Sequence, residues 1–388
     1  MAPFKRRSFL ATAAVAAGAS VTAGADPASA AAGPRPGPPE SAPLGSVACL
    51  LAVPEAGRGI DWLRSALQVA VELELSAIPP YLCGWWSVRD RGSEAARLIR
   101  RIIDDEMYHL GVVCNLLVAV GGQPRIKAAA PTYPGPLPGG VRTGVTLYLS
   151  GLTRSFVHDV MMAIEAPEES LARGGRAAPT VGAFYGDLLK GFRTVAPRLS
   201  ARGQLNARIG SDELRPAETL LDVERSLDII REQGEGTSRS PADSFDDDRP
   251  AHYYAFGEIY HGRQLRETPE GWTFTGPPVP FPDARPMARV PAGGWPRPPA
   301  PVQQLLHRFD TGYTTVLDAL DAAWADGGPR ALDAAIHAMR GVEEPAVRLM
   351  ETEIPGTRST YGPQFRVLHQ PPHMAPASAG DPGEGCPK

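Results

Sequence analysis

The chain has no excess of charge, no long apolar run and no motif of several common enzyme classes. Its formal net charge is −4 over 388 residues, which provides neither a basic surface for nucleic acid nor a cationic face for a membrane. No stretch of about 18 apolar residues occurs, so we expect no membrane span in the mature chain. There is no glycine-rich phosphate loop and no nucleophile elbow. The composition is that of a globular protein large enough to bury polar chemistry.

Cysteine is scarce, with four in the chain. Cys83 and Cys114 fall on two helices that we expect to be antiparallel, at positions roughly 20 Å apart along the bundle at ~1.5 Å per residue. That separation is beyond the reach of a disulfide, so both are expected to be buried thiols. Cys49 and Cys386, near the two ends of the mature chain, remain unassigned.

The first 30 residues have the features of an export signal. Lys5-Arg6-Arg7-Ser8-Phe9-Leu10 matches the twin-arginine pattern, an alanine-rich apolar run follows, and Ala28-Ser29-Ala30 offers a cleavage site. A disordered basic tail is the alternative interpretation. Twin-arginine export carries folded proteins, often with their cofactor inserted, and we expect this chain to act outside the cytoplasmic membrane.

Proline and glycine divide the rest of the chain into helices and irregular connections, and few segments read as strands. The fold class predicted is all-α. A Pro79-Pro80 pair should kink or interrupt the first helix. Helices are expected at about 61–77, 93–120, 153–166, 181–194, 217–233, 250–263, 302–325 and 329–353. The expected organisation is a signal peptide (1–30), a linker (31–46), a helical bundle with the candidate site (47–276), a Pro-rich connection (277–301), a C-terminal helix pair packed on the bundle (302–368) and a disordered tail (369–388).

The second helix places a carboxylate and an imidazole in its apolar stripe. Glu106 and His109 share the stripe of Ile99, Ile102 and Val113. Burying both groups costs several kcal/mol unless they are paired or bind a metal. Their spacing of three residues puts both on one helical face, where they can bind one metal ion or bridge two.

The other expected helices supply similar groups. Glu74 lies on the apolar stripe of the first helix, whereas Glu72 points elsewhere and should be solvated or contact a ligand without binding the metal itself. Glu165 ends the third helix, where a helix-end glutamate before a proline is the other interpretation. Glu258 and His261 form a second Glu-x-x-His pair. The order Glu, Glu-x-x-His, Glu, Glu-x-x-His is typical of four-helix di-iron and di-manganese carboxylate proteins, and donors without thiolate favour iron or manganese over structural zinc.

The sequence also resembles the ferritin-like iminophenyl-pyruvate dimer synthase family, most closely its stand-alone members. The likeness covers about residues 47–368. Its motifs are Val71–Leu82, Asp105–His109, Tyr133–Pro138, Ile164–Pro167, Gln233–Gly236, His252–Phe256 and Glu258–Arg263. The resemblance implies a ferritin-like bundle with additional helices and long Pro/Gly-rich loops, and an oxidative activity on amino-acid-derived imines or aromatic molecules in secondary metabolism.

The chain departs from that family at one position. Similar sequences often have a glutamate three residues before the histidine of the His-Tyr-Tyr motif, and Arg249 occupies it here. His252 therefore competes with His261 as the ligand from this helix. The intact Glu258–His261 pair favours His261, and if His252 is used instead, the second metal has lost a carboxylate.

The predicted site therefore comprises the metal ligands Glu74, Glu106, His109, Glu165, Glu258 and His261, with His252 as the alternative. Tyr81 and His158 could line a substrate pocket, although a packed core histidine is the other interpretation of His158. We expect a non-haem oxidase or oxygenase that holds two iron ions, or manganese, and uses dioxygen or peroxide on a small organic substrate. The alternative is an exported, non-enzymatic iron-handling protein. The sequence leaves the oligomeric state open.

Overall fold

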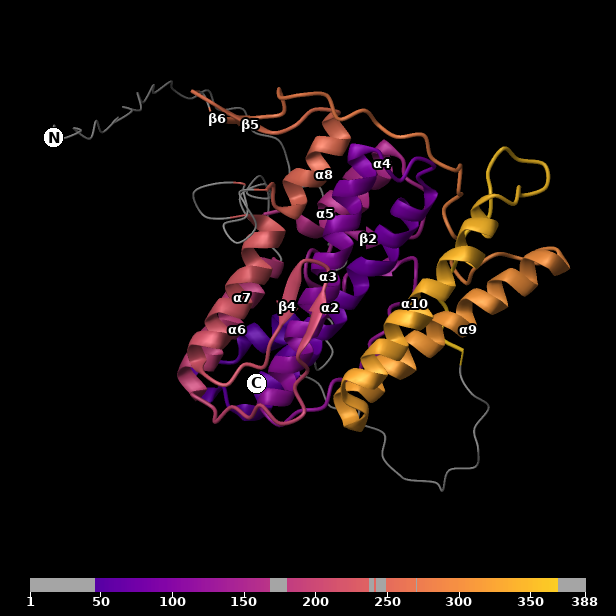
Figure 1. Cartoon of the computed structure of the whole chain (residues 1–388). Helices are drawn as coiled ribbons and strands as arrows, with labels where there is room; N and C mark the ends of the chain where they lie inside the picture. Colours follow the sequence, from indigo (N-terminus) through magenta and orange to yellow (C-terminus); the bar gives the residue numbers. More distant parts are fainter. Residues whose placement is uncertain (1–45, 168–179, 237–240, 242–248, 270, 369–388) are drawn as a thin grey trace, which may run out of the picture. The chain divides into compact units, whose positions relative to one another are not determined.

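The computed structural model describes residues 46–167, 180–236, 241, 249–269 and 271–368 (Figure 1). The predicted signal peptide, all of the linker but residue 46, and the predicted tail lie outside these residues, and so does Cys386.

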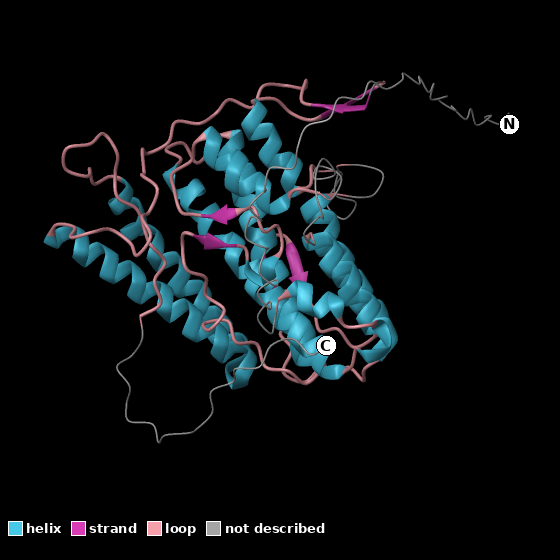
Figure 2. Ribbon diagram, turned by 180° about the vertical axis from the view of Figure 1, so that it is seen from behind, coloured by secondary structure: helices cyan, strands magenta, loops and turns pink. Residues whose placement is uncertain are grey.

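Helices form nearly all of the regular structure in this part of the chain, as Figure 2 shows, and the all-α prediction is confirmed. The helical segments are α1 (Val47–Ala52), η1 (Glu55–Gly57), α2 (Ile60–Ser87), α3 (Glu94–Ala119), η2 (Pro138–Gly140), α4 (Arg154–Phe156), η3 (Val157–Met161), α5 (Met162–Glu165), α6 (Val181–Val195), α7 (Leu220–Glu235), α8 (His252–His261), α9 (Ala300–Ala322), η5 (Ala323–Gly327) and α10 (Gly328–Met350). Three short antiparallel hairpins accompany them: β1 (Gly135–Pro136) with β2 (Thr146–Leu147), β3 (Ala207–Ile209) with β4 (Asp212–Leu214), and β5 (Arg266–Thr268) with β6 (Gly271–Thr273).

Helix α2 runs through Pro79 and Pro80 for 28 residues, so an interruption of the helix at this pair, one of the two predicted effects, is wrong. Pro80 has no N–H to donate to the carbonyl of Ser76, four residues earlier. The hydroxyl of the buried Tyr133 donates to that carbonyl instead, at 2.8 Å. Because this loop residue satisfies the orphaned acceptor, the helix continues and carries Tyr81 into the interior.

Helix α3 packs along α2 and has the predicted ends. The side chain of Ser93 caps its first turn by accepting from the N–H of Ala96 at 3.3 Å. Gly121, with φ of 73°, terminates it in the left-handed conformation that glycine tolerates. Cys83 and Cys114, on the two helices, are free and buried, as predicted. Cys49, by contrast, is disulfide-bonded.

The third predicted helix is present but irregular. It begins after Thr153 and ends at Glu165, and its middle segment, η3, is a π-helical turn. Helix α8 packs against this run and against α3 and α7, while α6 packs on α7 and α2. The N-terminal end of α8 is held by Arg101, whose Nη2 donates to the carbonyl of Pro250 at 2.6 Å. This contact fixes the position of His252, the first residue of the helix.

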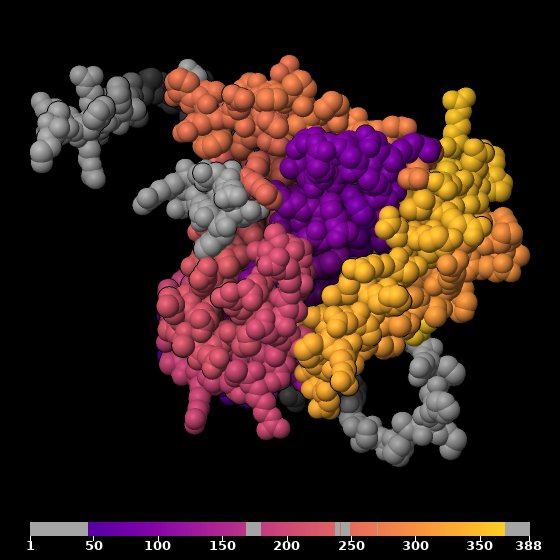
Figure 3. Space-filling model, in the orientation of Figure 1, coloured from indigo at the N-terminus to yellow at the C-terminus, as the bar shows by residue number. Residues whose placement is uncertain are grey.

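Helices α9 and α10 form an antiparallel pair beside α2 and α3 (Figure 1). In the space-filling view, the orange and yellow atoms of the C-terminal residues lie against the indigo and purple N-terminal part (Figure 3). Trp86 of α2 joins the two groups, since it stacks on Phe365 with ring centres 6.0 Å apart and meets the edge of Phe309. One core cluster extends through both groups of helices. Within the described residues, none of the helices is long and apolar enough to span a membrane.

Candidate metal centre

Five acidic and histidine side chains converge between α2, α3, α5 and α8. They form two groups in which one ligand atom of each residue lies within 4.8 Å of the others. Glu106 belongs to both groups, so its carboxylate lies where it can bridge two ions. The first group is Glu74, Glu106 and His109, and the second is Glu106, Glu165 and His252.

The two histidines point the same nitrogen into the centre. Nδ1 of His109 lies 3.6 Å from Oε2 of Glu74 and 3.9 Å from Oε1 of Glu106. Nδ1 of His252 lies 2.9 Å from Oε1 of Glu106 and 3.9 Å from Oε2 of Glu165. The imidazole rings are stacked with their centres 5.6 Å apart. Each half of the centre thus has one histidine, one carboxylate of its own and a share of Glu106.

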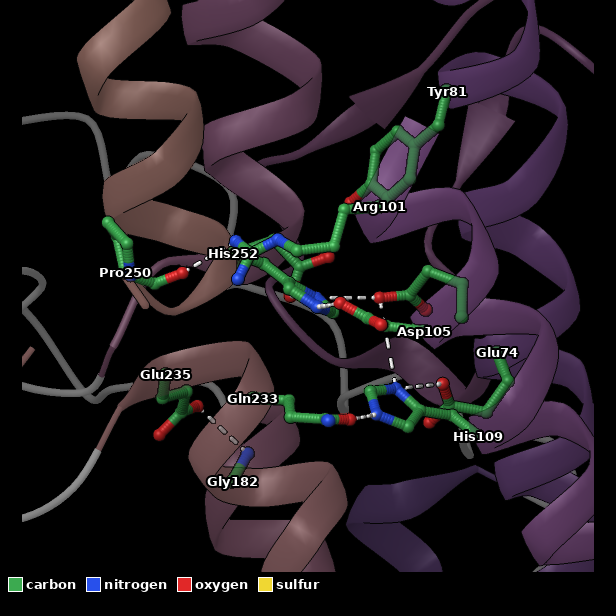
Figure 4. A network of polar contacts seen from close by, with 12 residues as sticks. Glu74, Tyr81, Arg101, Asp105, His109, Gly182, Gln233, Glu235, Pro250 and His252 are labelled. Carbon is green, nitrogen blue, oxygen red and sulfur yellow. Dashed lines mark hydrogen bonds and ion pairs between the residues drawn. The ribbon is translucent and has the colours of Figure 1, made fainter. Parts of the chain in front are cut away.

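The outer nitrogen of each histidine has its own acceptor (Figure 4). Nε2 of His109 is 2.7 Å from Oε1 of Gln233 on α7, and Nε2 of His252 is 3.1 Å from Oδ2 of Asp105 on α3. Because an amide oxygen and a carboxylate both require a donor, Nε2 of each imidazole carries a proton, and Nδ1 is the nitrogen that would bind a metal ion in place of a proton. The two halves differ in charge, with a neutral acceptor behind His109 and an acidic one behind His252.

Two buried tyrosines hold the outer carboxylates. The hydroxyl of Tyr81 donates to Oε1 of Glu165 at 2.5 Å, and the hydroxyl of Tyr185 on α6 donates to Oε1 of Glu74. Burial, reinforced by the adjacent carboxylates, raises the pKa of both tyrosines well above the usual value. Both phenols are therefore neutral donors, which fix one oxygen of each carboxylate and leave the other facing the centre.

The electrostatics of the centre fit a pair of cations. Burial, and then the charge of Glu165, raises the pKa of Glu106 well above its usual value. Burial would lower the pKa of His109, but Glu74 and Glu106 raise it to about 9. For Asp105, burial acts to raise the pKa, yet the hydrogen bond and charge of His252 hold it below its usual value.

The charge balance leads to the same conclusion. Four carboxylates meet here, those of Glu74, Asp105, Glu106 and Glu165. When all four are ionised, their negative charges equal the charge of two divalent ions. In addition, Nδ1 of His252 is buried and makes no aligned hydrogen bond with any described residue. An orphaned imidazole nitrogen beside crowded carboxylates is the arrangement that a metal ion resolves.

The expected convergence of Glu258 and His261 on this centre is wrong. His261 is exposed and stacks on Phe274, with ring centres 4.3 Å apart. Glu258 is buried, but its Oε1 accepts from the N–H of Leu265 at 2.8 Å, just beyond the end of α8. At ~1.5 Å per residue, nine residues along a helix carry His261 roughly 13 Å beyond His252. The alternative residue, His252, occupies the place predicted for His261.

His158 also lies elsewhere than expected. It is exposed, pairs with Asp159 at 2.8 Å and neighbours Tyr260, so it neither lines a pocket nor packs in the core. Both interpretations assumed α-helical spacing between His158 and Glu165. The π-helical turn η3 winds more residues into one turn, which rotates His158 away from the face of Glu165.

Sequence reasoning missed three residues that support the centre. Asp105 and Gln233 are the first residues of two motifs that carry the family resemblance, Asp105–His109 and Gln233–Gly236, but neither residue had a predicted role. Tyr185 stands outside every motif, and its role follows only from the packing of α6 on α2.

A narrow pocket of about 40 Å³ reaches the centre between α2, α5, α6 and α7. Its wall includes Glu74, Glu106, His109 and Glu165. At its α6–α7 side the N–H of Gly182 donates to Oε1 of Glu235 at 3.0 Å. The pocket is thus far smaller than a cavity of roughly 150 Å³ that holds a benzene molecule.

A buried carboxylate–histidine centre in a helical bundle is typical of ferritin-like proteins, and comparison with known proteins agrees. The family model described as ferritin-like matches residues 67–261, half of the chain and all five converging residues. The chain therefore belongs to the ferritin-like family. It is also similar to a crystal structure of a ferritin like protein from Caulobacter vibrioides, with a TM-score of 0.58 and 23% identity, over 79% of this chain and 97% of that chain. That likeness shows the fold. No curated protein matches the chain.

Proposed function

We propose that this protein is a non-haem di-iron oxidase or oxygenase of small organic molecules. The observation that carries the proposal is the position of Glu106, shared by two buried carboxylate–histidine groups. Oxygen and nitrogen donors without thiolate suit iron, with manganese as the alternative metal. The resemblance to the iminophenyl-pyruvate dimer synthase family supports an amino-acid-derived imine or aromatic substrate in secondary metabolism.

In this proposal Glu74 and His109 would hold one ion, Glu165 and His252 would hold the other, and Glu106 would be shared between them. Two ferrous ions, when bound, would supply electrons for the activation of dioxygen or peroxide. The protein fixes the ligands in advance: Tyr81 and Tyr185 orient the outer carboxylates, and Gln233 and Asp105 orient the imidazoles.

The narrow pocket decides what reaches this centre. Its volume of about 40 Å³ suits dioxygen or peroxide but excludes an aromatic ring. An organic substrate of the proposed class therefore needs the wall at Gly182 and Glu235 to open before it contacts the ligands. Burial of the ligands otherwise keeps bulk water away and limits unproductive loss of the oxidant.

An exported, non-enzymatic iron-handling protein is the second candidate, favoured by membership of the ferritin-like family itself. The two are separated by adding excess ferrous iron aerobically and measuring the iron retained after desalting. An oxidase retains about two ions per chain, whereas a storage protein accumulates many. Retention far above two per chain would replace the first proposal with the second.

Two substitutions on helix α8 test whether His252 is required for activity. His252→Ala should abolish substrate-dependent dioxygen consumption, while His261→Ala, at the exposed end of α8, should leave it unchanged. Candidate substrates are aromatic amino acids and their imines. Equal activity of the two variants would refute the assignment of His252.

We also propose twin-arginine export, on the sequence of the first 30 residues. Replacing both arginines, Arg6→Lys with Arg7→Lys, should leave the protein in the cytoplasm. Unchanged export of the double variant would contradict this.

A further inference from the structure

A second cavity lies between the bundle and the C-terminal helix pair. It measures about 340 Å³ and is mainly apolar, with Leu75, Ile78 and Leu82 of α2 on one side and Leu317 and Leu332 on the other. None of its lining residues belongs to the narrow pocket at the metal centre. Its volume is in the range of pockets that hold small organic ligands, roughly 300–1,000 Å³.

A third cavity adjoins the apolar one and has the opposite character. It measures about 320 Å³ and shares Trp85, Arg100 and Asp104 with its neighbour. The basic residues on its wall outnumber the acidic ones, which are Asp104 and Asp105. Both aspartates have partners of their own, because Asp104 pairs with Arg100 at 2.8 Å and Asp105 with His252 at 3.1 Å. The arginines on this wall are Arg91, Arg97, Arg100, Arg101 and Arg249.

This cationic cavity also has donors without acceptors. Nε1 of Trp85, Nη1 of Arg91 and Nε of Arg101 are all buried, and none has a hydrogen-bond partner among the described residues. The guanidinium groups are anchored through other atoms: Nη2 of Arg91 donates to Glu343 at 3.2 Å, and Nη2 of Arg101 donates to a backbone carbonyl. All three residues also line the cationic cavity, and buried donors without acceptors are unfavourable, so a small rotation of these side chains toward an anion in the cavity would give each donor an acceptor.

We propose that the two cavities form one binding site for a small organic carboxylate with an apolar body. The carboxylate accepts from the guanidinium groups that line the cationic cavity, and the apolar body lies between α2–α3 and α9–α10. Charge selects the head group, since guanidinium groups bind carboxylates well. The adjoining apolar cavity selects a hydrophobic carboxylate over a small inorganic anion. This site is separate from the proposed metal chemistry, apart from Asp105, which also accepts from His252.

The test is calorimetric titration of the metal-loaded protein with decanoate and with indole-3-propionate, which separate an aliphatic from an aromatic body. Decanol and acetate serve as probes of the body and the head group alone. We expect one carboxylate per chain, with decanol and acetate each at least tenfold weaker. Glu74→Ala, which damages the metal centre, should leave this binding intact.

Two variants test the two halves of the site. Arg91→Gln should weaken decanoate binding at least tenfold, whereas its matched control Arg89→Gln, paired with Asp283 outside both cavities, should not. Ala335→Phe, which fills the apolar cavity, should weaken decanoate and decanol alike. The proposal is overturned if neither carboxylate binds, if decanol binds as tightly as decanoate, or if Arg91→Gln and Arg89→Gln behave alike. Binding lost in Glu74→Ala would instead place the ligand at the metal centre and equally overturn it.

Discussion

Substitution of Asp105 by asparagine tests how the two halves of the metal centre differ. The carboxylate of Asp105 lies 3.1 Å from Nε2 of His252, and its pKa is held below the usual value, so it is ionised at neutral pH. Asparagine keeps the shape and can still accept the imidazole proton, but it removes the charge. The corresponding acceptor behind His109 is already neutral, because it is the amide of Gln233.

Asp105→Asn should lower the metal affinity of only the half that contains Glu165 and His252. Removing an outer partner of a ligating histidine usually costs 10- to 100-fold in affinity, or about 1.4–2.7 kcal/mol at 1.36 kcal/mol per tenfold. Anaerobic titration with ferrous iron against a competing chelator should therefore show one binding step weakened by this factor relative to the wild type and the other unchanged. The unchanged step belongs to the half of Glu74 and His109.

Asp104→Asn is the matched control, since the neighbouring aspartate faces Arg100 and not the centre. It should bind both ions like the wild type. Equal isotherms for Asp104→Asn and Asp105→Asn, or a loss of both ions from Asp105→Asn, would refute the reasoning that Asp105 acts through His252.

Two further predictions concern stability. Tyr133→Phe should lower the free energy of unfolding by about 1–3 kcal/mol, because it leaves the Ser76 carbonyl without a donor. In a Pro80→Ala background the backbone N–H returns, so urea unfolding should show a much smaller loss from Tyr133→Phe. Equal losses in the two backgrounds would contradict this explanation of the continuous α2 helix. Burial raises the pKa of Asp310 to about 6 from 3.8, so the folded state holds this proton more tightly and its stability falls as pH rises between these values. Asp310→Asn should remove this loss, which is on the order of 3 kcal/mol. The melting temperature of the variant minus that of the wild type should therefore increase between pH 4 and 6. A difference that does not change with pH would contradict the assignment of the loss to Asp310.

The helices and one half of the centre could be predicted because local pattern determines them. Glu106 and His109 stand in the apolar stripe of α3, so their burial follows from helical periodicity alone. Glu74 followed in the same way from the stripe of α2. Glycine and serine at the ends of α3 also fixed its limits by local chemistry.

The remainder depends on contacts distant in sequence. The choice between His252 and His261 depends on which end of α8 contacts α3. Arg101 of α3 donates to the carbonyl of Pro250 and so holds the N-terminal end of α8, with His252, against α3. Continuity of α2 through Pro80 depends on Tyr133, a loop residue. A π-helical turn displaced His158 without any proline or glycine to signal it. Spacing within one helix could reveal none of these.

The central claim is that Glu106 bridges two ions, and metal analysis tests it most directly. Protein purified from an exporting host should contain about two iron or manganese ions per chain by inductively coupled plasma mass spectrometry. Glu106→Ala should lose most of both ions while keeping its helical circular dichroism. Glu258→Ala, the matched control in the other Glu-x-x-His pair, should keep them. Full occupancy in Glu106→Ala, or wild-type protein that binds fewer than two ions under saturating metal, would contradict the account.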